Sequence, residues 1–517
     1  MEGTIYSLIP PILMIILVLL TRKVLLSLGA GILVGALMIE SFDVLETIKR
    51  IWFTFQELFY AEGAWDWWSI QLVIFLLLLG MLIAFLTASG GAKAFGDWAI
   101  HKIKTREGSQ YMTGILGIGI FIDDYFNSLT IGQVSRPVTD RYRVSRAKLA
   151  YLIDSTSAPV TVISPISSWG AYIIGIVATI ITTNELTNYQ AFNSFIQMIP
   201  YNFYALSAIL LVFIAIWLKL DIGPMKKHED RARETGQLVD PENDDIPGDL
   251  QSEVYESPKG KVGHLLIPIL VLIGVTLSMM IYTGIQASGE TNLIAIFADT
   301  DVNLSLVVGG AVALLISIIF YFTQSGEKTS FGRVSVEGIK AMLPAIYILV
   351  LAWMIVSIIG AIGTDVYLSG LVEQSNMDVA YLPFLLFIIS GFMAFSTGTS
   401  WGTFGIMLPI AGSMAATLDP ALFIPAMAAV LAGSVFGDHC SPISDTSVLS
   451  STGAGSNHID HVLTQIPYAM LAALASAVGY LLFAWTNSLL LSLLVTLVVL
   501  LLLAYLAKQF YGNKESV

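Results

Sequence analysis

Uninterrupted apolar runs recur along the whole of this 517-residue chain. Each run has roughly 20 residues, which is enough for a helix to cross the hydrocarbon core of a bilayer. Only 12% of the residues are charged, about half the share typical of a soluble protein. The sequence therefore predicts an all-α polytopic membrane protein. The first run, near 5–21, has no preceding basic residues and no cleavage site after it, so we interpret it as a span and not as a signal peptide.

The basic residues predict the orientation, because Lys and Arg accumulate in cytoplasmic loops. Placing Arg22 and Lys23 inside puts the N-terminus outside. The same assignment brings 89–110, 136–148, the charged stretch 220–262 and the C-terminus to the cytoplasm. In this topology all but two of the 25 basic residues lie inside. The localisation we expect is the cytoplasmic (inner) membrane of a prokaryote.

Two apolar segments fit hairpins better than full spans. Segment 111–134 has basic residues on both sides, whereas 383–410 has none on either side. Each would then enter and leave the bilayer on one side, as a re-entrant hairpin. Polar, non-helical backbone at this depth is tolerated only where it is buried in protein or lines a wet cavity.

The resulting order is the same in both halves: three spans, a re-entrant hairpin, an interrupted transmembrane helix and a span. This predicts two inverted repeats plus an extra C-terminal helix, an arrangement typical of transporters. Faint sequence symmetry supports it, since "LIDSTSAPVTVISP" aligns with "VFGDHCSPISDTSV" and brings Asp154 within one position of Asp438, so we match these two aspartates. The predicted divisions are a first transmembrane repeat (1–219), a cytoplasmic charged linker (220–262), a second inverted repeat (263–487) and a C-terminal helix and tail (488–517). The linker has the mixed charge of a solvated segment.

Four polar interruptions at membrane depth are the candidate binding elements. Their Ser, Thr, Gly and Pro residues loosen a helix and free carbonyl groups, which together with carboxylates suit a small cation. An intramembrane carboxylate indicates function, because burying its charge is costly. The candidate ion- or substrate-binding residues are Asp123, Asp124, Asn127, Asp154, Ser155, Thr156, Ser157, Ser396, Thr397, Thr399, Ser400, Asp438, Ser441, Asp445 and Thr446.

Within this set we expect Na⁺ at Asp154, Asp438 and Asp445. Which of Asp123 and Asp124 faces the site stays open. Each Ser or Thr hydroxyl could equally bind the ion or simply hydrogen-bond to backbone groups freed by the break. No Lys or Arg lies in the middle of a span, so the core has acids without fixed counter-cations. The simplest mechanism is that Na⁺ and H⁺ compete for these carboxylates.

Histidine and cysteine indicate little metal chemistry. His439 and Cys440 are neighbours, and adjacent residues on a helix do not face each other. The other histidines, like Asp460, fall in loops or at span ends. We expect no cofactor beyond the transported Na⁺ and H⁺, and no nucleic-acid partner; the surrounding partner is the lipid bilayer.

The polar segments resemble the NhaC family of sodium/proton antiporters, within the wider ion-transporter superfamily. The resemblance rests on "GDHCSPISDTSVLSSTGAGSNHIDHVLTQIPYA" (437–469), "STGTSWGTFGIMLPIA" (396–411) and "IDDYFNSLTIG" (122–132). It implies secondary active transport, with one domain moving as an elevator against a dimerising scaffold, and hence a homodimer. It also implies Na⁺ ligands among the hairpin and broken-helix residues.

Two other functions were weighed against Na⁺/H⁺ exchange. A Na⁺-coupled carrier of an amino acid or small organic acid would use Tyr125, Phe126 and Trp401 for an organic pocket, but the core offers an anion no arginine. An intramembrane aspartyl protease needs G-x-G-D, whereas Val435 replaces the first glycine before Asp438. We therefore expect a transporter and not an enzyme.

The sorting of basic residues leads to a labelling prediction. Single cysteines placed within 136–146 and 225–255, in a Cys440→Ser background, should react with an impermeant thiol reagent only from the cytoplasmic side. Labelling of position 141 from outside intact cells would contradict the hairpin and, with it, the repeat.

Overall fold

The computed structural model describes residues 3–511 except for 22, 62, 100–101, 122, 166, 243–253, 256, 290–291, 294–295, 297–298, 325–326, 365, 368–369 and 371–377. Within this part, nine helices are long and apolar enough to cross a membrane, or up to 11 if each bent pair is one span. Its sheet is a hairpin of two short antiparallel strands, β1 (Tyr60–Ala61) and β2 (Ala64–Trp65). The predicted all-α polytopic class is confirmed.

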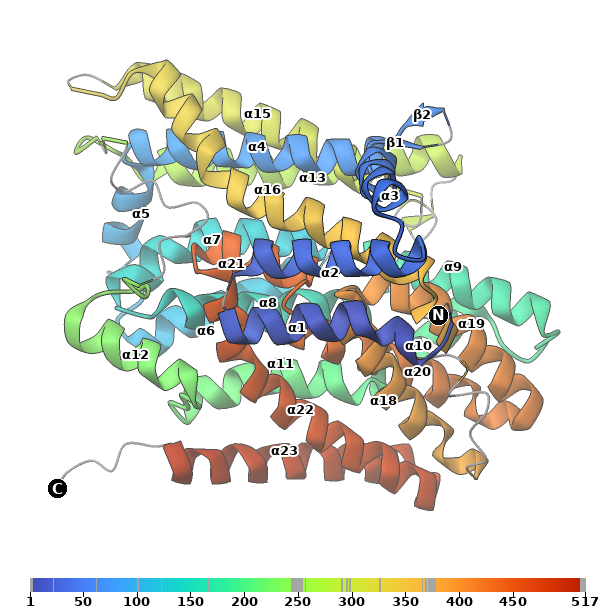
Figure 1. Cartoon of the computed structure of the whole chain (residues 1–517). Coiled ribbons are helices and arrows are strands. Elements are labelled where there is room, and N and C mark those ends of the chain that lie inside the picture. Colours follow the sequence, from blue (N-terminus) through green and yellow to red (C-terminus); the bar gives the residue numbers. More distant parts are fainter. Residues whose placement is uncertain are drawn as a thin grey trace.

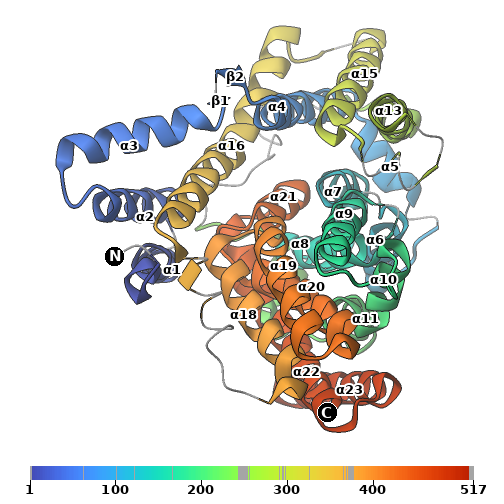
Figure 2. The same ribbon diagram turned by 90° about the vertical axis from the view of Figure 1, so that its right-hand side faces the viewer.

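Helices from both halves of the chain form what we call the peripheral bundle. They are α1 (Ile9–Thr21), α2 (Val24–Ile39), α3 (Val44–Glu57), α4 (Trp67–Ala88), α5 (Gly91–Ala99), α13 (Gly263–Ser288), α15 (Val302–Thr323) and α16 (Phe331–Ala361). Neighbours pack in the order α13, α15, α4, α16, α2, α1. Figure 2 shows this bundle along two sides of the remaining helices.

The remaining helices form the main bundle. They are α6 (Arg106–Gly119), α7 (Asp124–Arg141), α8 (Arg146–Ile163), α9 (Ser168–Thr183), α10 (Ala191–Met198), α11 (Phe203–Trp217), α12 (Pro224–Thr235), α18 (Leu382–Thr397), α19 (Ser400–Leu418), α20 (Phe423–Cys440), α21 (Asp445–Ala454), α22 (His458–Thr486) and α23 (Leu489–Tyr511). Helix α8 is central and contacts α6, α7, α11 and α21. Short 3₁₀ turns precede α1, α11, α18 and α20: Ile5–Leu8, Ile199–Tyr201, Val379–Tyr381 and Pro420–Leu422. The largest apolar core lies inside this bundle.

The order of element types is the same in both halves. In the first half, the spans α1, α2 and α4 are followed by the hairpin α6–α7, the broken pair α8–α9 and then α11. In the second half, the spans α13, α15 and α16 are followed by the hairpin α18–α19, the broken pair α20–α21 and then α22, with α23 added at the end. In Figure 1, α5, α12 and the end of α23 lie at one end of the molecule, and α3 and β1–β2 lie at the other. That the halves are related by inversion, and which end faces the cytoplasm, stay predictions.

The first-half interruption was predicted at the wrong place. The sequence indicated a break at 154–159, but α8 continues through Pro159 to Ile163, and α9 begins at Ser168. Membrane helices tolerate an internal proline because neighbouring helices and hydroxyls re-satisfy the backbone. The break instead begins at Ser164, whose extended backbone (φ −94°, ψ 117°) precedes Pro165, because proline disfavours a helical residue before it.

The broken helix of the second half, α20–α21, is interrupted in the same way, by an extended serine before a proline. Ser441 is extended (φ −81°, ψ 127°) immediately before Pro442, and Ser444 caps the following α21 by accepting a hydrogen bond from Ser447 N–H (3.1 Å). The two breaks correct the predicted pairing of Asp154 with Asp438. Asp438 lies in the last turn of α20, whereas Asp154 lies in the middle of α8.

The beginning of the linker is packed and not simply solvated, contrary to the interpretation of its charge pattern. On α12, Glu229 is fully buried, accepts a hydrogen bond from Ser145 N–H (2.8 Å) and pairs with Arg106. Arg146 N–H donates to the carbonyl of Leu238 (3.0 Å). Mixed charge in a sequence does not reveal whether the charges face water or pair across a contact.

Glycines set the closest helix contacts of the main bundle. A Cβ on Gly433 of α20 would lie 2.2 Å from the carbonyl oxygen of Phe387 on α18. A Cβ on Gly132 of α7 would lie 2.3 Å from backbone atoms of Gly453 on α21. Small residues allow membrane helices to approach this closely. The half-helices that carry the polar breaks are therefore held by backbone-to-backbone packing.

This packing predicts a stability difference between two glycine substitutions. Gly433→Ala should lower the melting temperature of the detergent-purified protein, because overpacking costs about 1–3 kcal/mol. Gly274→Ala on α13 is the matched control, since its Cβ would meet nothing within 4 Å. That change should be neutral or slightly stabilising, because alanine favours a helix. Equal melting temperatures for the two variants would contradict the proposed close contact.

Candidate ion-binding site

The polar breaks of the main bundle meet through direct contacts between segments far apart in the sequence. Ser441 Oγ donates to the carbonyl of Phe395 (2.8 Å), which ties the α20–α21 break to the α18–α19 hairpin. Gly398 forms the tip of that hairpin with φ +67°, and a Cβ there would lie 2.6 Å from the Ile443 side chain. Only glycine fits a left-handed turn packed this tightly.

The α6–α7 hairpin contributes two aspartates that face the α8–α9 break. Asp123 accepts a hydrogen bond from Ser168 Oγ (2.8 Å), and Asp124 accepts one from the indole N–H of Trp169 (2.8 Å). Both aspartates are buried. Ser168 and Trp169 are the first two residues of α9.

The second half contributes an equivalent pair. Asp438 is fully buried and accepts a hydrogen bond from Ser400 Oγ (2.7 Å). Asp445 accepts hydrogen bonds from the Tyr125 hydroxyl and from Thr446 N–H (2.9 Å). The Tyr125 contact joins the hairpin of one half to the broken helix of the other. Asp445 also lies close enough to interact electrostatically with both Asp124 and Asp438.

Each of these four carboxylates lies at or against the N-terminus of a half-helix. Asp124 begins α7 and Asp445 begins α21, while Asp123 and Asp438 contact the first residues of α9 and α19. Helix N-termini carry partial positive charge and stabilise anions. In the described part of the chain, no Lys or Arg forms an ion pair with Asp124, Asp438 or Asp445.

We call Asp123, Asp124, Asp438 and Asp445 the acidic cluster. Two of its buried oxygens, and one of Asn127 on α7, have no hydrogen-bond partner among the described residues. They are Oδ1 of Asp438, Oδ2 of Asp124 and Oδ1 of Asn127. Asn127 is oriented by its amide N–H groups, which donate to the carbonyls of Gly117 (2.8 Å) and Ile120 (2.5 Å). Buried oxygens without donors are costly unless they bind something. Carboxylate and amide oxygens together can replace the water shell of a small cation.

Asp154 has a different environment. Its Oδ2 accepts hydrogen bonds from Ser447 (2.9 Å), His461 (3.1 Å) and Gln465 (2.6 Å), and its Oδ1 accepts one from Ser450 (3.1 Å). The side chain is fully buried. Asp154 therefore ties α8 to both α21 and α22, and both of its oxygens are already occupied.

His461 and Gln465 are site residues that the sequence did not indicate. They come from the first turns of α22, which the sequence assigns to a loop and a span end. Their signal is the i, i+4 spacing of two polar residues, which places both on one helix face. Trp169, Ser168, Ser447 and Ser450 were also missed, because single polar or aromatic residues in an apolar stretch do not indicate a partner.

The remaining predicted residues support the helices around this centre. Ser157 accepts a hydrogen bond from Ser128 (3.1 Å), which also contacts Ser450 (3.0 Å), so a chain of hydroxyls leads to Asp154. Thr156 donates to the carbonyl of Leu152 (2.7 Å), and Ser155 is buried beside it. Ser396 and Thr397 donate to carbonyls of their own helix, Thr399 caps α19, and Thr446 contacts Ser444 (2.9 Å). These hydroxyls satisfy backbone or neighbouring hydroxyls.

A cavity of about 400 Å³ leads toward the acidic cluster from one end of the molecule. Its wall includes Ser168, the hydrogen-bond partner of Asp123, and Asp301 is the charged residue in its lining. The other lining residues are Trp67, Trp68, Gln71, Tyr172, Thr300, Val302, Asn303 and Trp401. The cavity lies between the peripheral and main bundles and is a route by which a cation could approach.

The histidines provide little for a transition metal. The side-chain contact of His439 Nδ1 is with the Tyr204 hydroxyl (2.9 Å), and not with a cysteine, a carboxylate or a second histidine. His228, Asp240 and Asp460 come within 4.8 Å of one another, but Arg231 contacts both His228 (3.0 Å) and Asp240 (2.9 Å), so its positive charge disfavours a metal there. Burial lowers the pKa of His228. Asp460, expected in a loop, is buried in the first turn of α22.

Comparison with known proteins identifies the family. The family model described as "Na+/H+ antiporter family" matches residues 160–485, more than half of the chain. The chain belongs to the Na⁺/H⁺ antiporter family. An uncharacterized protein of Haemophilus influenzae is 44% identical over 513 residues, covering 98% of this chain and 96% of that protein.

Two more distant relatives carry functional names. The malate-2H⁺/Na⁺-lactate antiporter of Bacillus subtilis is 28% identical over 225 residues, covering 42% of this chain and 43% of that protein. An uncharacterized Na⁺/H⁺ antiporter of Haemophilus influenzae is 38% identical over 97 residues, covering 18% of this chain and 20% of that protein. This antiporter-family protein is thus a multi-pass membrane transporter and not an enzyme.

The contrast between Asp154 and Asp438 predicts different effects of truncation on stability. Asp154→Ala should destabilise the antiporter by at least about 3 kcal/mol, because four buried donors lose their acceptor. Asp438→Ala removes one hydrogen bond and relieves repulsion from neighbouring carboxylates, so its loss should be much smaller. Thermal melting of both variants in the same detergent measures the difference. An equal loss would show that Asp154 is not an anchor.

Proposed function

We propose that this protein exchanges Na⁺ for H⁺ across the membrane, as the NhaC resemblance implies. The observation that carries the proposal is the set of Asp124, Asp438 and Asp445, in which Asp445 lies close enough to interact electrostatically with each of the other two. None of the three has a basic partner in the described part of the chain. Adjacent carboxylates repel one another when ionised. Their negative charge at membrane depth is therefore compensated by protons or by a bound cation.

The proposed chemistry is competition for the same oxygens. When these aspartates are deprotonated, their oxygens without hydrogen-bond donors become ligands for Na⁺. These are Asp438 Oδ1 and Asp124 Oδ2, together with Oδ1 of Asn127, which also lies on α7. Half-helix ends and unwound carbonyls supply the rest of the shell, as in other transporters with broken helices. Protonation removes the negative charge and releases Na⁺. One site thus carries either ion, which couples their opposite movements.

Asp154 has a positioning role in this proposal. The sequence indicated it as a third Na⁺ ligand together with Asp438 and Asp445, but its four hydrogen bonds favour the role of an anchor between α8, α21 and α22. It fixes the helix α21 that begins with Asp445. The Ser447 and Ser450 hydroxyls that bind it lie two and five residues after that N-terminus.

Alternating access would follow from movement of the main bundle past the peripheral bundle. All four acidic groups belong to the main bundle, and the two bundles touch chiefly where α5 meets α7 and where α16 meets α21. The wider proposal includes a homodimer, an inner membrane location and an external N-terminus. Its support is the family resemblance and the distribution of basic residues.

A second candidate is exchange that also carries a small organic acid. It is favoured by the malate and lactate exchange for which the Bacillus subtilis relative is named and by the aromatic side chains of Tyr172 and Trp401 in the cavity wall. Against it, no Lys or Arg lines that cavity among the described residues. A carboxylate substrate would therefore have to enter together with its cation.

The central test is Asp438→Asn. This change keeps the size of the side chain but removes its charge and its titration, so it should abolish Na⁺-evoked pH change in proteoliposomes. In the wild type, apparent Na⁺ affinity should increase as pH is raised from about 6 to 9, because fewer protons compete for the carboxylates. Asp438→Asn should give no response at any pH in this range.

The matched control is Asp97→Asn, a change of the same kind at an aspartate that is 54% exposed on α5. It should leave exchange and its pH profile unchanged. Normal exchange by Asp438→Asn with an unshifted profile would contradict the mechanism. Adding malate or lactate to the same vesicles separates the two candidates: a Na⁺ response that requires the organic acid would favour the second.

A further inference from the structure

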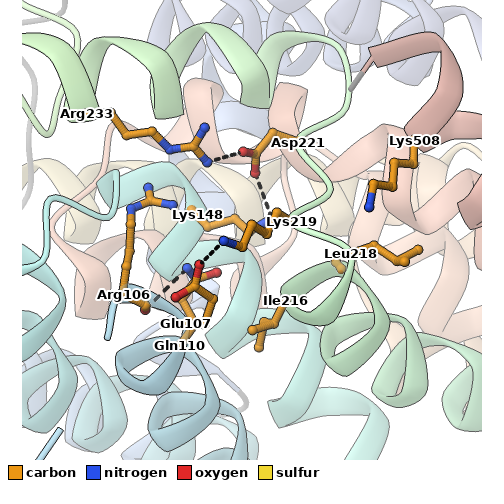
Figure 3. A pocket seen from close by; sticks show the side chains of 11 residues that line it. Arg106, Glu107, Gln110, Lys148, Ile216, Leu218, Lys219, Asp221, Arg233 and Lys508 are labelled. Atoms are coloured by element: carbon orange, nitrogen blue, oxygen red, sulfur yellow. Dashed lines mark hydrogen bonds and ion pairs between the residues drawn. The ribbon is translucent and has the colours of Figure 1, made fainter. Parts of the chain in front are cut away.

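A second cavity lies at the end of the molecule that carries α12 and the end of α23. Its volume is about 650 Å³, and Figure 3 shows its lining. The wall combines residues of α6, α8, α11, α12 and α23 with the turn after α11. The lining residues are Arg106, Glu107, Gln110, Lys148, Ala215, Ile216, Leu218, Lys219, Asp221, Arg233 and Lys508.

Positive charge exceeds negative charge in this cavity. Five of the lining side chains are basic and two are acidic. Asp221 pairs with Arg233 (2.6 Å) and Lys148 (3.2 Å), as Figure 3 shows. Glu107 pairs with Lys219 (3.0 Å). Arg106 pairs with the buried Glu229 behind the lining. Three acids thus meet four of the five bases, and a smaller excess of positive charge remains.

Part of this charge is built into the protein interior. Lys148 is only 1% exposed, and its ammonium group also donates to the carbonyl of Leu220 (3.0 Å). Nε of Arg106 is buried and has no hydrogen-bond partner in the described part of the chain. Leu220, Asp221 and Tyr468 accept hydrogen bonds from Lys148, which uses its three donors. The unused buried N–H of Arg106 therefore favours an anionic ligand.

The surroundings place the cavity at the depth of lipid headgroups. The neighbouring Trp217 ends α11 and is 71% exposed, and exposed tryptophans gather at membrane–water interfaces. The cavity wall also contains the apolar Ile216 and Leu218. Lys508 lies near the end of α23, a very apolar helix that is mostly unburied.

We propose that this cavity binds the phosphodiester headgroup of an anionic phospholipid. Basic pockets between transmembrane helices bind such headgroups, and the apolar wall distinguishes a lipid from free phosphate, which has no acyl chains to place there. The bound headgroup would join α6 to α23, since Arg106 and Lys508 come from these helices. Lys148 of α8 contacts the Tyr468 hydroxyl of α22 (3.4 Å), so the site adjoins the helix that carries Asp154 and one of the two helices that donate to it.

Lipid binding to the full-length detergent-purified protein tests this assignment without any transport measurement. Native mass spectrometry and thermal melting would compare phosphatidylglycerol, phosphatidylcholine and inorganic phosphate. The wild type should prefer phosphatidylglycerol to the other two. The Lys219→Gln/Lys508→Gln double variant should bind it roughly 30-fold more weakly, as expected for two interfacial lysines.

The control is Lys93→Gln/Lys227→Gln, which removes two exposed lysines outside the cavity lining, one on α5 and one on α12. It should keep the wild-type affinity. Equal affinity for phosphatidylglycerol and phosphatidylcholine, or equal losses in the two double variants, would overturn the proposal. Stabilisation by inorganic phosphate as large as that by phosphatidylglycerol would overturn the assignment to a lipid.

Discussion

The structure depends on how it holds carboxylates at membrane depth without a basic partner. Asp445 is close enough to interact electrostatically with Asp124 and with Asp438, and no Lys or Arg of the described chain pairs with these three. Helix N-termini and single hydroxyl, indole or phenol donors take the place of a counter-cation. A helix must therefore end and restart at this depth, which explains why Pro165 and Pro442 follow extended serines and why Gly398 forms a hairpin tip.

Broken helices need a rigid support, because each half has lost the hydrogen bonds that would hold it to the other. Backbone contact at Gly433 and Gly132 supplies part of it. Asp154 supplies another part by accepting four hydrogen bonds from α21 and α22. The protein thus has two kinds of buried aspartate. Both oxygens of Asp154 accept hydrogen bonds, whereas Asp124 and Asp438 each keep an oxygen for a ligand. A sodium–proton exchanger needs both kinds, since only the second kind is able to change its occupant.

The position of the acidic cluster also has a functional consequence. It lies in the main bundle, near a cavity that is shared with the peripheral bundle at one end. At the other end, the packed start of the linker and the basic cavity surround the ends of α8 and α22. Helices α8 and α22 thus extend from the acidic cluster to the region where the basic cavity and the start of the linker meet.

The sequence by itself determined the membrane class, the order of element types and most of the acidic residues, because apolar length and polar interruptions are local properties. Asp438, Asp445 and Ser400 were predicted from such interruptions. Tertiary structure alone decided their partners: His461 and Gln465 reach Asp154 from about 300 positions away, and Tyr125 reaches Asp445 across the two halves. It also decided that the first break begins at Ser164 and not at Asp154, because whether a membrane helix continues through a proline depends on neighbouring helices and hydroxyls that no local pattern reveals.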